Sequence, residues 1–376
     1  MVSIVADCYL SHNLGDDLFL TTLVSRYPNV HFVVFADSTY EYLHDRFSNL
    51  ELVISPNRHG IIGKICGHVS KSFRRNKYFR SADAVVTIGG SLYWEATKPK
   101  SFKDQISEQR RLHNDRHKAR ITSKYMVIGA NFGPWHSDYF LNLYRNFFAQ
   151  YCDDVCFRDS YSADLFSTVS TTRQAPDVLF GMKLPQVSKR HQVFFSIVDL
   201  YHWKYGSLAS KANAYEQMMI HLIKRYIARG YEVVLCSFCQ AEGDEQCLER
   251  LYCAALEQEL GVRLLRYRDN MDEVLKEIAA SKVVIGTRFH SVILGLSAGA
   301  AVLPVIYSAK TTHVLEDIGF DMNNTIDLKA DDWETQIVEA LPEAIQFDVS
   351  SQQVSAVMQF AALDQLVEQM DDKYDD

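Results

Sequence analysis

The sequence has no run of about 18 to 20 apolar residues, the length that a membrane-spanning helix requires. It has no excess of proline, glycine or charge either, since 8 of its 376 residues are Pro, 17 are Gly and 23% are charged. These absences argue against membrane-spanning, collagen-like and disordered classes. The hydrophobic share of 47% and the length predict a globular protein with two domains.

Two phosphate-binding glycine motifs are also missing. The sequence contains neither G-x-G-x-x-G nor G-x-x-x-x-G-K-[ST], the motifs of dinucleotide-binding and P-loop proteins. We therefore expect no cofactor. No secretory signal is recognisable in the first residues, where Val2-Ser3-Ile4-Val5 is typical of a strand. We expect a cytoplasmic protein.

The eight cysteines are scattered along the chain. Several lie in apolar runs, which favours reduced thiols in a core. The pairs Cys152/Cys156 and Cys236/Cys239 leave a four-thiolate zinc site as an alternative. Their spacings differ and they are far apart in the sequence, whereas structural zinc sites draw their ligands from one compact module. We expect no metal.

The net charge of −8 argues against a general nucleic-acid binder. Basic residues are nevertheless concentrated in two blocks, within 58–80 and 110–124. One interpretation is a solvated helix face. The alternative is peripheral contact with an anionic membrane, on the inner face of the plasma membrane, or with a diphosphate-lipid substrate.

Short apolar, β-branched runs alternate with longer amphipathic stretches from one end of the chain to the other. This alternation predicts parallel sheets, and it restarts after a turn-rich passage near residue 185. The fold class is therefore α/β, with two Rossmann-like doubly wound domains facing a cleft. The predicted divisions are 1–185, 186–349, and a C-terminal helix with an acidic tail over 350–376.

Several polar or glycine-rich segments follow predicted strands, where doubly wound sheets bind ligands. In Ser11–Asp17, Gly15 can bring the backbone close to an anion beside Asn13 and Asp16, although an aspartate that caps the next helix is an equal alternative. The other segments contain Gly89, Gly90 and Ser91, Asn131 and Gly133, and Arg158. The glycine segments can be plain turns, and Arg158 can pair with a local carboxylate instead of binding an anion.

The segment Val283–Leu296 is the most informative, because a buried strand is followed by Arg288, Phe289 and His290 and then by an apolar helix. Arginine matches carboxylate or phosphate groups, and histidine titrates near neutral pH. Together they suit an acidic substrate that must be protonated. Lys310, after the next strand, can add a donor, although a surface lysine is the default interpretation.

In these segments the sequence resembles the polysaccharide pyruvyltransferase family over residues 11 to about 320. The resemblance rests on the order of its motifs: N-x-G-D at 13–16, Gly89-Gly90, Gly133-Pro134, R-D-x-x-S at 158–162, Pro176-Asp177, R-x-H at 288–290 and the stretch 304–310. Phe289, Ser291 and Ser91 depart from residues that are common in the family, which leaves the acceptor sugar open.

The resemblance implies transfer of a pyruvyl group from phosphoenolpyruvate onto hydroxyls of a polysaccharide or lipid-linked oligosaccharide, in exopolysaccharide or cell-surface glycan biosynthesis. It also implies a fold similar to the two-domain glycosyltransferase (GT-B-like) architecture. His290 would be the catalytic acid, and Arg158, Arg288, Phe289 and Lys310 would bind phosphoenolpyruvate. A glycosyltransferase that uses a nucleotide sugar, and a catalytically silent glycan-binding relative, remain alternatives.

Overall fold

The computed structural model describes residues 1–54, 75–95, 102–330, 333 and 341–375. These residues form two compact units, each with its own parallel sheet. The N-terminal unit comprises Met1–Leu10, Leu18–Val178 and Val357–Asp376, and the C-terminal unit comprises Ser11–Asp17 and Leu179–Ala356.

The predicted divisions at residues 185 and 349 differ from these units because two segments belong to the unit that is remote in sequence. Residues 11–17 belong to the C-terminal unit, where Leu14 N donates to Phe238 O at 3.1 Å. The C-terminal segment returns to the N-terminal unit, where the buried side-chain amide of Gln359 donates to Ala175 O at 2.7 Å. Long-range hydrogen bonds of this kind leave no signal in the sequence.

The sheet of the N-terminal unit has seven parallel strands in the order β3-β2-β1-β4-β5-β6-β7. Because the order reverses between β1 and β4, the unit is doubly wound, as in Rossmann-like folds. The strands are β1 (Ser3–Cys8), β2 (His31–Ala36), β3 (Leu50–Ile54), β4 (Ala84–Ile88), β5 (Tyr125–Ala130), β6 (Asp154–Phe157) and β7 (Thr172–Gln174).

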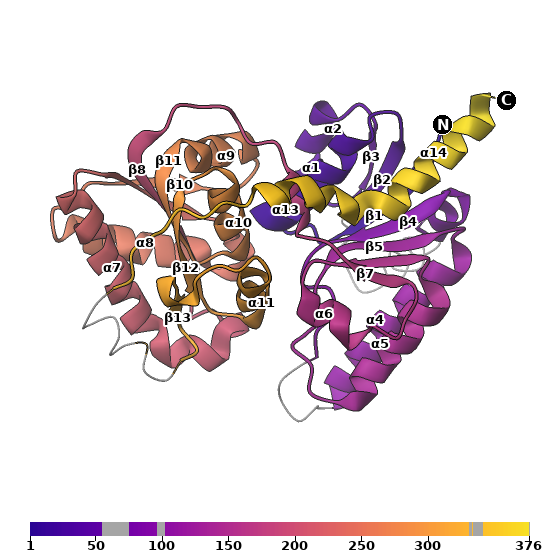
Figure 1. The fold of residues 1–376 in the computed structure, drawn as a ribbon, viewed down its shortest axis with the longest axis horizontal. Coiled ribbons are helices and arrows are strands. Elements are labelled where there is room, and N and C mark those ends of the chain that lie inside the picture. The colour runs from indigo at the N-terminus through magenta and orange to yellow at the C-terminus, as the bar shows by residue number, and fades with distance from the viewer. Residues whose placement is uncertain (55–74, 96–101, 331–332, 334–340, 376) are drawn as a thin grey trace, which may run out of the picture. The chain divides into compact units, whose positions relative to one another are not determined.

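Helices cover both faces of this sheet, with α4 and α5 on one face and α14 on the other (Figure 1). The aromatic side chains Phe140, Tyr144, Phe147 and Phe148 of α5 are buried against the strands and form much of the core. The helices are α1 (Leu14–Arg26), α2 (Tyr42–Arg46), α4 (Phe102–Ile121), α5 (Asp138–Tyr151), α6 (Ser160–Leu165) and α14 (Ala361–Asp375).

The C-terminal unit has a six-stranded parallel sheet in the order β10-β9-β8-β11-β12-β13, with its reversal between β8 and β11. Its strands are β8 (Arg190–Ile197), β9 (Glu232–Ser237), β10 (Val262–Arg266), β11 (Ser281–Gly286), β12 (Ala301–Ile306) and β13 (Ile326–Asp327). Its helices are α7 (Ala212–Ala228), α8 (Asp244–Leu256), α9 (Met271–Ala280), α10 (Phe289–Ser297), α11 (Ala309–Asp317) and α13 (Ser350–Ser355), with short 3₁₀ segments at Trp203–Lys211 and Gln240–Glu242.

The acidic tail predicted at the end of the chain continues the C-terminal helix, since α14 runs to Asp375. The helix is anchored upstream, where the Asp364 carboxylate accepts hydrogen bonds from the Tyr27 hydroxyl at 2.6 Å and from Arg26 Nη2 at 2.7 Å. Once a helix is nucleated by such contacts, adding further residues is inexpensive in free energy.

Most of the first basic block, residues 58–74, lies outside the described residues. Of its remainder, Lys77 and Arg80 are exposed, whereas the Arg75 guanidinium lies 4.6 Å from the centroid of the Phe35 ring. Part of this block therefore makes internal contacts instead of forming a solvated face.

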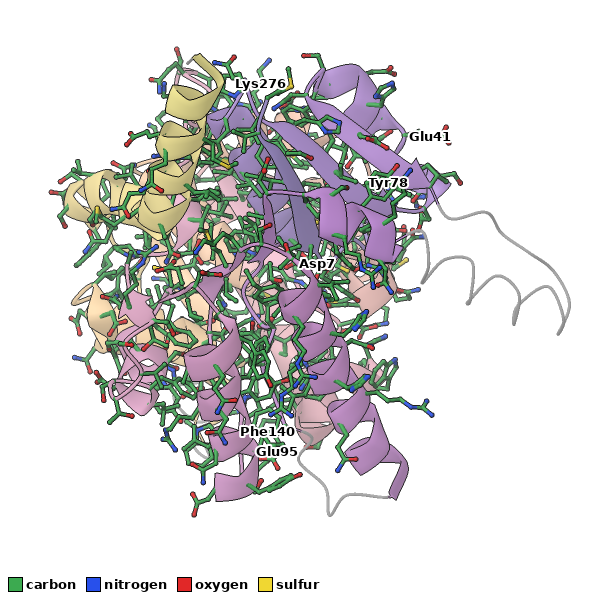
Figure 2. The ribbon with its side chains drawn as sticks, turned by 90° about the vertical axis from the view of Figure 1, so that its right-hand side faces the viewer. Asp7, Glu41, Tyr78, Glu95, Phe140 and Lys276 are labelled. Carbon is green, nitrogen blue, oxygen red and sulfur yellow. The ribbon has the colours of Figure 1, made fainter. Side chains whose placement is uncertain are left out.

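The second basic block lies on α4, and one of its cations also points inward. Lys118 Nζ donates to Asp7 Oδ2 at 2.5 Å and to Asp115 Oδ1 at 3.0 Å. Figure 2 labels Asp7, which comes from β1. Burial opposes the positive charge, but Asp7 and Asp115 outweigh it and raise the pKa of Lys118. The solvated-face interpretation therefore fails for Lys118.

The seven cysteines in the described ranges form no disulfide with one another. Burial raises the pKa of Cys236 well above its ordinary value, so its thiol stays protonated. The two close cysteine pairs lie in different units, and the described residues contain no group of three or more side chains suited to hold a metal ion. None of the helices that the structure describes has the length and apolar character needed to cross a membrane.

Candidate functional site

The turn that contains Arg288 lies where the strand order of the C-terminal unit reverses, the place where open parallel sheets bind ligands. It follows β11, and the end of the neighbouring strand β8 fixes its backbone. Ser196 Oγ accepts hydrogen bonds from the backbone N–H groups of Thr287 and Arg288, both at 3.1 Å. Ser291 Oγ donates to Arg288 O at 2.6 Å. The turn is therefore held before any ligand arrives.

The Arg288 side chain is 6% exposed and lies between two carboxylates. Its Nε donates to Asp244 Oδ2 at 2.9 Å, its Nη2 to Asp244 Oδ1, and its Nη1 to Glu242 Oε2. These bonds use three of the five N–H donors of the guanidinium. The expectation that Arg288 offers net positive charge to a substrate therefore needs correction, because nearby acids already balance that charge.

Glu242 is held in its ionised form, whereas burial outweighs the effect of Arg288 on Asp244 and raises the pKa of Asp244 above its ordinary value of 3.8. Burial alone would raise the pKa of Glu242, but Arg288 and Lys204 outweigh it and hold that pKa well below its ordinary value of 4.5. The Tyr205 hydroxyl also donates to Glu242 Oε2 at 2.8 Å. Asp244 Oδ2 accepts from the backbone N–H of Cys239 at 2.9 Å. Arg288 and Lys204 thus form one hydrogen-bonded network with Glu242 and Asp244, in which only the Lys204 side chain is substantially exposed.

His290, in the first turn of α10, packs against the N-x-G-D loop of residues 11–17. A Cβ atom built on Gly15 would lie 1.6 Å from His290 Nδ1, so only glycine leaves room for the imidazole. Asn13 forms an antiparallel bridge with Cys239, and its Oδ1 accepts from Gly15 N at 3.2 Å. The loop therefore helps to define the position of the imidazole.

The start of α1 is fixed in the same unit. The Tyr267 hydroxyl donates to Asp17 Oδ2 at 2.6 Å, and Asp17 is buried. Asp16 lies beside it in the first turn of the helix and is partly exposed. Asp17, the residue after the motif, is thus a buried anchor next to the predicted ligand residue Asp16.

Lys310 and Phe289 extend the site along the edge of the sheet. Lys310 Nζ lies 6.0 Å from the centroid of the buried Phe289 ring. The helices α10 and α11 begin after the adjacent parallel strands β11 and β12, and neither N-cap residue bonds its helix through a side chain. Helix N-termini carry partial positive charge, so this edge favours an anion.

Arg158 is the central residue of a second cluster, which lies wholly in the N-terminal unit. It is 2% exposed; its Nη1 donates to Asp177 Oδ2 at 3.0 Å and its Nη2 to Asn131 Oδ1 at 2.6 Å. A Cβ atom on Gly90 would lie 2.5 Å from Arg158 Nη1, so the turn Gly89-Gly90 makes space for the guanidinium. The local ion pair, one of the two alternatives that the sequence left open, is therefore present.

The remaining predicted residues of this unit are loop positions around that cluster. Ser91 is exposed, and the Gly133–Pro134 peptide bond is cis. Figure 2 shows Glu95, which is buried, close to Phe140 near the start of α5. Glu95 Oε2 accepts from Ser137 N at 2.9 Å, which stabilises the N-terminus of that helix.

The predicted residues therefore fall into two groups. Asn13, Gly15 and Asp16 share the C-terminal unit with Arg288, Phe289, His290 and Lys310, whereas Gly89, Gly90, Ser91, Asn131, Gly133 and Arg158 lie in the N-terminal unit. Sequence reasoning missed Glu242 and Asp244. The available signal was their position just beyond the carboxyl end of β9, the same criterion that selected Arg288.

Two doubly wound units, with charged residues at the strand ends, define a two-domain α/β protein of the Rossmann-like type. The chain belongs to the polysaccharide pyruvyl transferase family, whose model matches residues 13–309. It is 24% identical over 261 residues to the amylovoran biosynthesis protein AmsJ of Erwinia amylovora. That match covers 63% of this chain and 60% of the relative. The resemblance predicted from the motifs is thus confirmed.

Solved structures show the same fold at low sequence identity. The UDP-GlcNAc 2-epimerase of Neisseria meningitidis, bound to UDP-GlcNAc, aligns with a TM-score of 0.52 and 9% identity, over 98% of this chain and all (100%) of that one. The Anabaena protein Alr3699/HepE in complex with UDP-glucose aligns with a TM-score of 0.50 and 11% identity, over 96% and 100% of the two chains. The predicted fold class, two Rossmann-like α/β units of the GT-B type, is confirmed.

Proposed function

We propose that this protein transfers a pyruvyl group from phosphoenolpyruvate onto two hydroxyls of one sugar, which forms a ketal and releases inorganic phosphate. The observation that carries the proposal is the placement of His290 against Gly15, beside Arg288 and Lys310, at the strand ends of a chain from this family. The relative that takes part in amylovoran biosynthesis supports a polysaccharide, or the lipid-linked oligosaccharide that precedes it, as the acceptor.

In this proposal His290 gives a proton to the methylene carbon of phosphoenolpyruvate. Protonation makes C2 electrophilic, and one sugar hydroxyl attacks it with loss of a proton. Phosphate then leaves, and the second hydroxyl attacks C2 and loses its proton to close the ketal. Histidine suits the first step because its proton exchanges near neutral pH.

The anionic groups of phosphoenolpyruvate need partners other than the charge of Arg288, which Glu242 and Asp244 balance. We propose that Lys310 and the N-termini of α10 and α11 supply the positive potential. The role of Arg288 is then to orient the substrate through its remaining N–H donors. The buried contacts of Arg158 with Asp177 and Asn131 favour a structural role for that residue.

The proposal is tested by incubating the purified protein with phosphoenolpyruvate and lipid-linked oligosaccharides from the source organism. We expect phosphate release and, by mass spectrometry, a product that has gained one ketal-linked pyruvyl group. His290→Gln should lower turnover by about 10²- to 10⁴-fold, the usual contribution of a general acid. The matched control is His221→Gln, at an exposed position of α7. Equal turnover of the two variants would contradict the role of His290.

Ligand-induced stabilisation separates pyruvyl transfer from glycosyl transfer. A ligand that binds only the native state raises the melting temperature. We expect stabilisation by phosphoenolpyruvate and none by UDP-glucose or UDP-GlcNAc. Stabilisation by a nucleotide sugar alone would support the glycosyltransferase alternative instead.

A further inference from the structure

Two exposed aromatic side chains, Tyr201 and Trp203, lie on the segment that follows β8. Tyr201 is 52% exposed and Trp203 is 83% exposed, the highest value among the exposed large hydrophobic side chains in the described part of the chain. An exposed tryptophan leaves a large apolar surface in contact with water, which is unfavourable. Such side chains are common where a protein contacts a ligand or partner. β8 borders the strand-order reversal, so the segment begins at the candidate site.

The N-terminal end of this segment is fixed by the polar contacts of the buried Asp199. Asp199 Oδ1 accepts a hydrogen bond from Tyr201 N at 3.0 Å and another from Arg250 Nη2 at 2.7 Å. The Arg250 guanidinium also lies 5.1 Å from the centroid of the Tyr201 ring. The aromatic side chains therefore stand on a braced segment, which lowers the entropy lost when a ligand binds.

The C-terminal end of the segment joins the network of Arg288. Lys204, next to Trp203, forms an ion pair with Glu242, and the Tyr205 hydroxyl donates to the same carboxylate at 2.8 Å. Glu242 in turn pairs with Arg288. The backbone that carries Trp203 is thus tied through its next two residues to the network of Arg288.

The chemistry of this surface matches a sugar ring. A pyranose has an apolar C–H face that stacks on an aromatic ring, and a rim of hydroxyls that needs hydrogen-bond partners. Trp203 and Tyr201 supply the aromatic faces. The Lys204 side chain, which is 48% exposed, and the partly exposed His202 supply polar groups beside them.

We propose that Tyr201 and Trp203 form the platform that binds the acceptor saccharide. The inference rests on the proposed function, because it assigns the acceptor side of the same reaction. It commits to a sugar ring as the occupant, and a second copy of the chain or a protein partner is an outcome of the test.

Kinetics with depyruvylated oligosaccharides, prepared by acid hydrolysis of the exopolysaccharide of the source organism, test the platform. We expect Trp203→Ala to raise the KM for the oligosaccharide by about 10- to 100-fold, with kcat and the KM for phosphoenolpyruvate within about twofold of the parent. Trp203→Phe retains an aromatic face and should recover most of the affinity. The matched control is Tyr139→Ala, at a side chain of α5 that is 60% exposed. Equal KM values for Trp203→Ala and this control would overturn the proposal.

A binding measurement separates failure of this inference from failure of the proposed function. The protein has four tryptophans, so the fluorescence difference between the parent and Trp203→Phe isolates Trp203. Titration with the same oligosaccharides, without phosphoenolpyruvate, should change this difference signal even if the parent releases no phosphate. An unchanged signal would overturn the proposal. So would a change of oligomeric state, in which the parent sediments as a dimer and Trp203→Ala as a monomer while oligosaccharide binding is unaltered.

Discussion

Replacing Arg288 by alanine should destabilise the C-terminal unit as well as abolish turnover, because the guanidinium compensates two buried carboxylates. Asp244 is fully buried, and the Glu242 side chain is 8% exposed. Removing one partner of a buried ion pair typically costs about 3–5 kcal/mol. A unit of this size loses roughly 2–4 °C in Tm per kcal/mol, so we expect a decrease of about 6–20 °C.

Thermal unfolding followed by circular dichroism or calorimetry measures this decrease. The matched control is Arg229→Ala in the same unit, since Arg229 pairs with Glu343 but its side chain is 46% exposed. Exposed pairs contribute about 0–1 kcal/mol, so the Tm of the control should change by a few degrees at most.

A second variant identifies the cause of the destabilisation. If uncompensated acids are responsible, adding Glu242→Gln and Asp244→Asn to Arg288→Ala should restore part of the lost stability, in the manner of a double-mutant cycle. Equal Tm values for Arg288→Ala and Arg229→Ala would refute the structural role of the buried pair. Arg288 would then be free to act purely as a substrate clamp.

Three further predictions follow from the geometry. Gly15→Ala should displace the His290 ring and lower kcat by at least about 100-fold with little change in Tm; unaltered kcat would show that the imidazole position is unimportant. Because the pKa of Glu242 is lowered in the folded protein, its ionised carboxylate stabilises the fold above pH 4.5, and this contribution to the free energy of unfolding is lost as the pH falls below that value. Glu242→Gln should therefore flatten the acid side of a plot of unfolding free energy against pH. Parallel plots for parent and variant would contradict this. Asp177→Ala should leave Arg158 buried without its carboxylate and cost about 3–5 kcal/mol in urea unfolding; a cost below about 1 kcal/mol would argue against a structural pair.

The central strands were predictable from the sequence because their side chains are apolar on both faces, which gives uninterrupted β-branched runs. The strands β4 (Ala84–Ile88) and β12 (Ala301–Ile306) are of this kind. The short edge strand β7 (Thr172–Gln174) gives no such run, because its side chains are polar and it has a neighbour on one side only. The helix α4 is equally hard to recognise in the sequence, because its composition is strongly polar and gives no clear apolar stripe.

Candidate residues for the chemistry could also be predicted from the sequence, because ligands bind at the carboxyl ends of parallel strands and these ends can be located from the strand pattern. That rule selected Arg288, His290 and Lys310. It also marks Glu242 and Asp244, but it could not pair them with Arg288, since they are more than forty residues away. Nor could it place Gly15 against His290, which are 275 positions apart. The sequence thus determined which charged groups lie at the strand ends. Only the tertiary structure decided which of those charges are already paired, because pairing depends on contacts between residues far apart in the sequence, which the local sequence pattern does not encode.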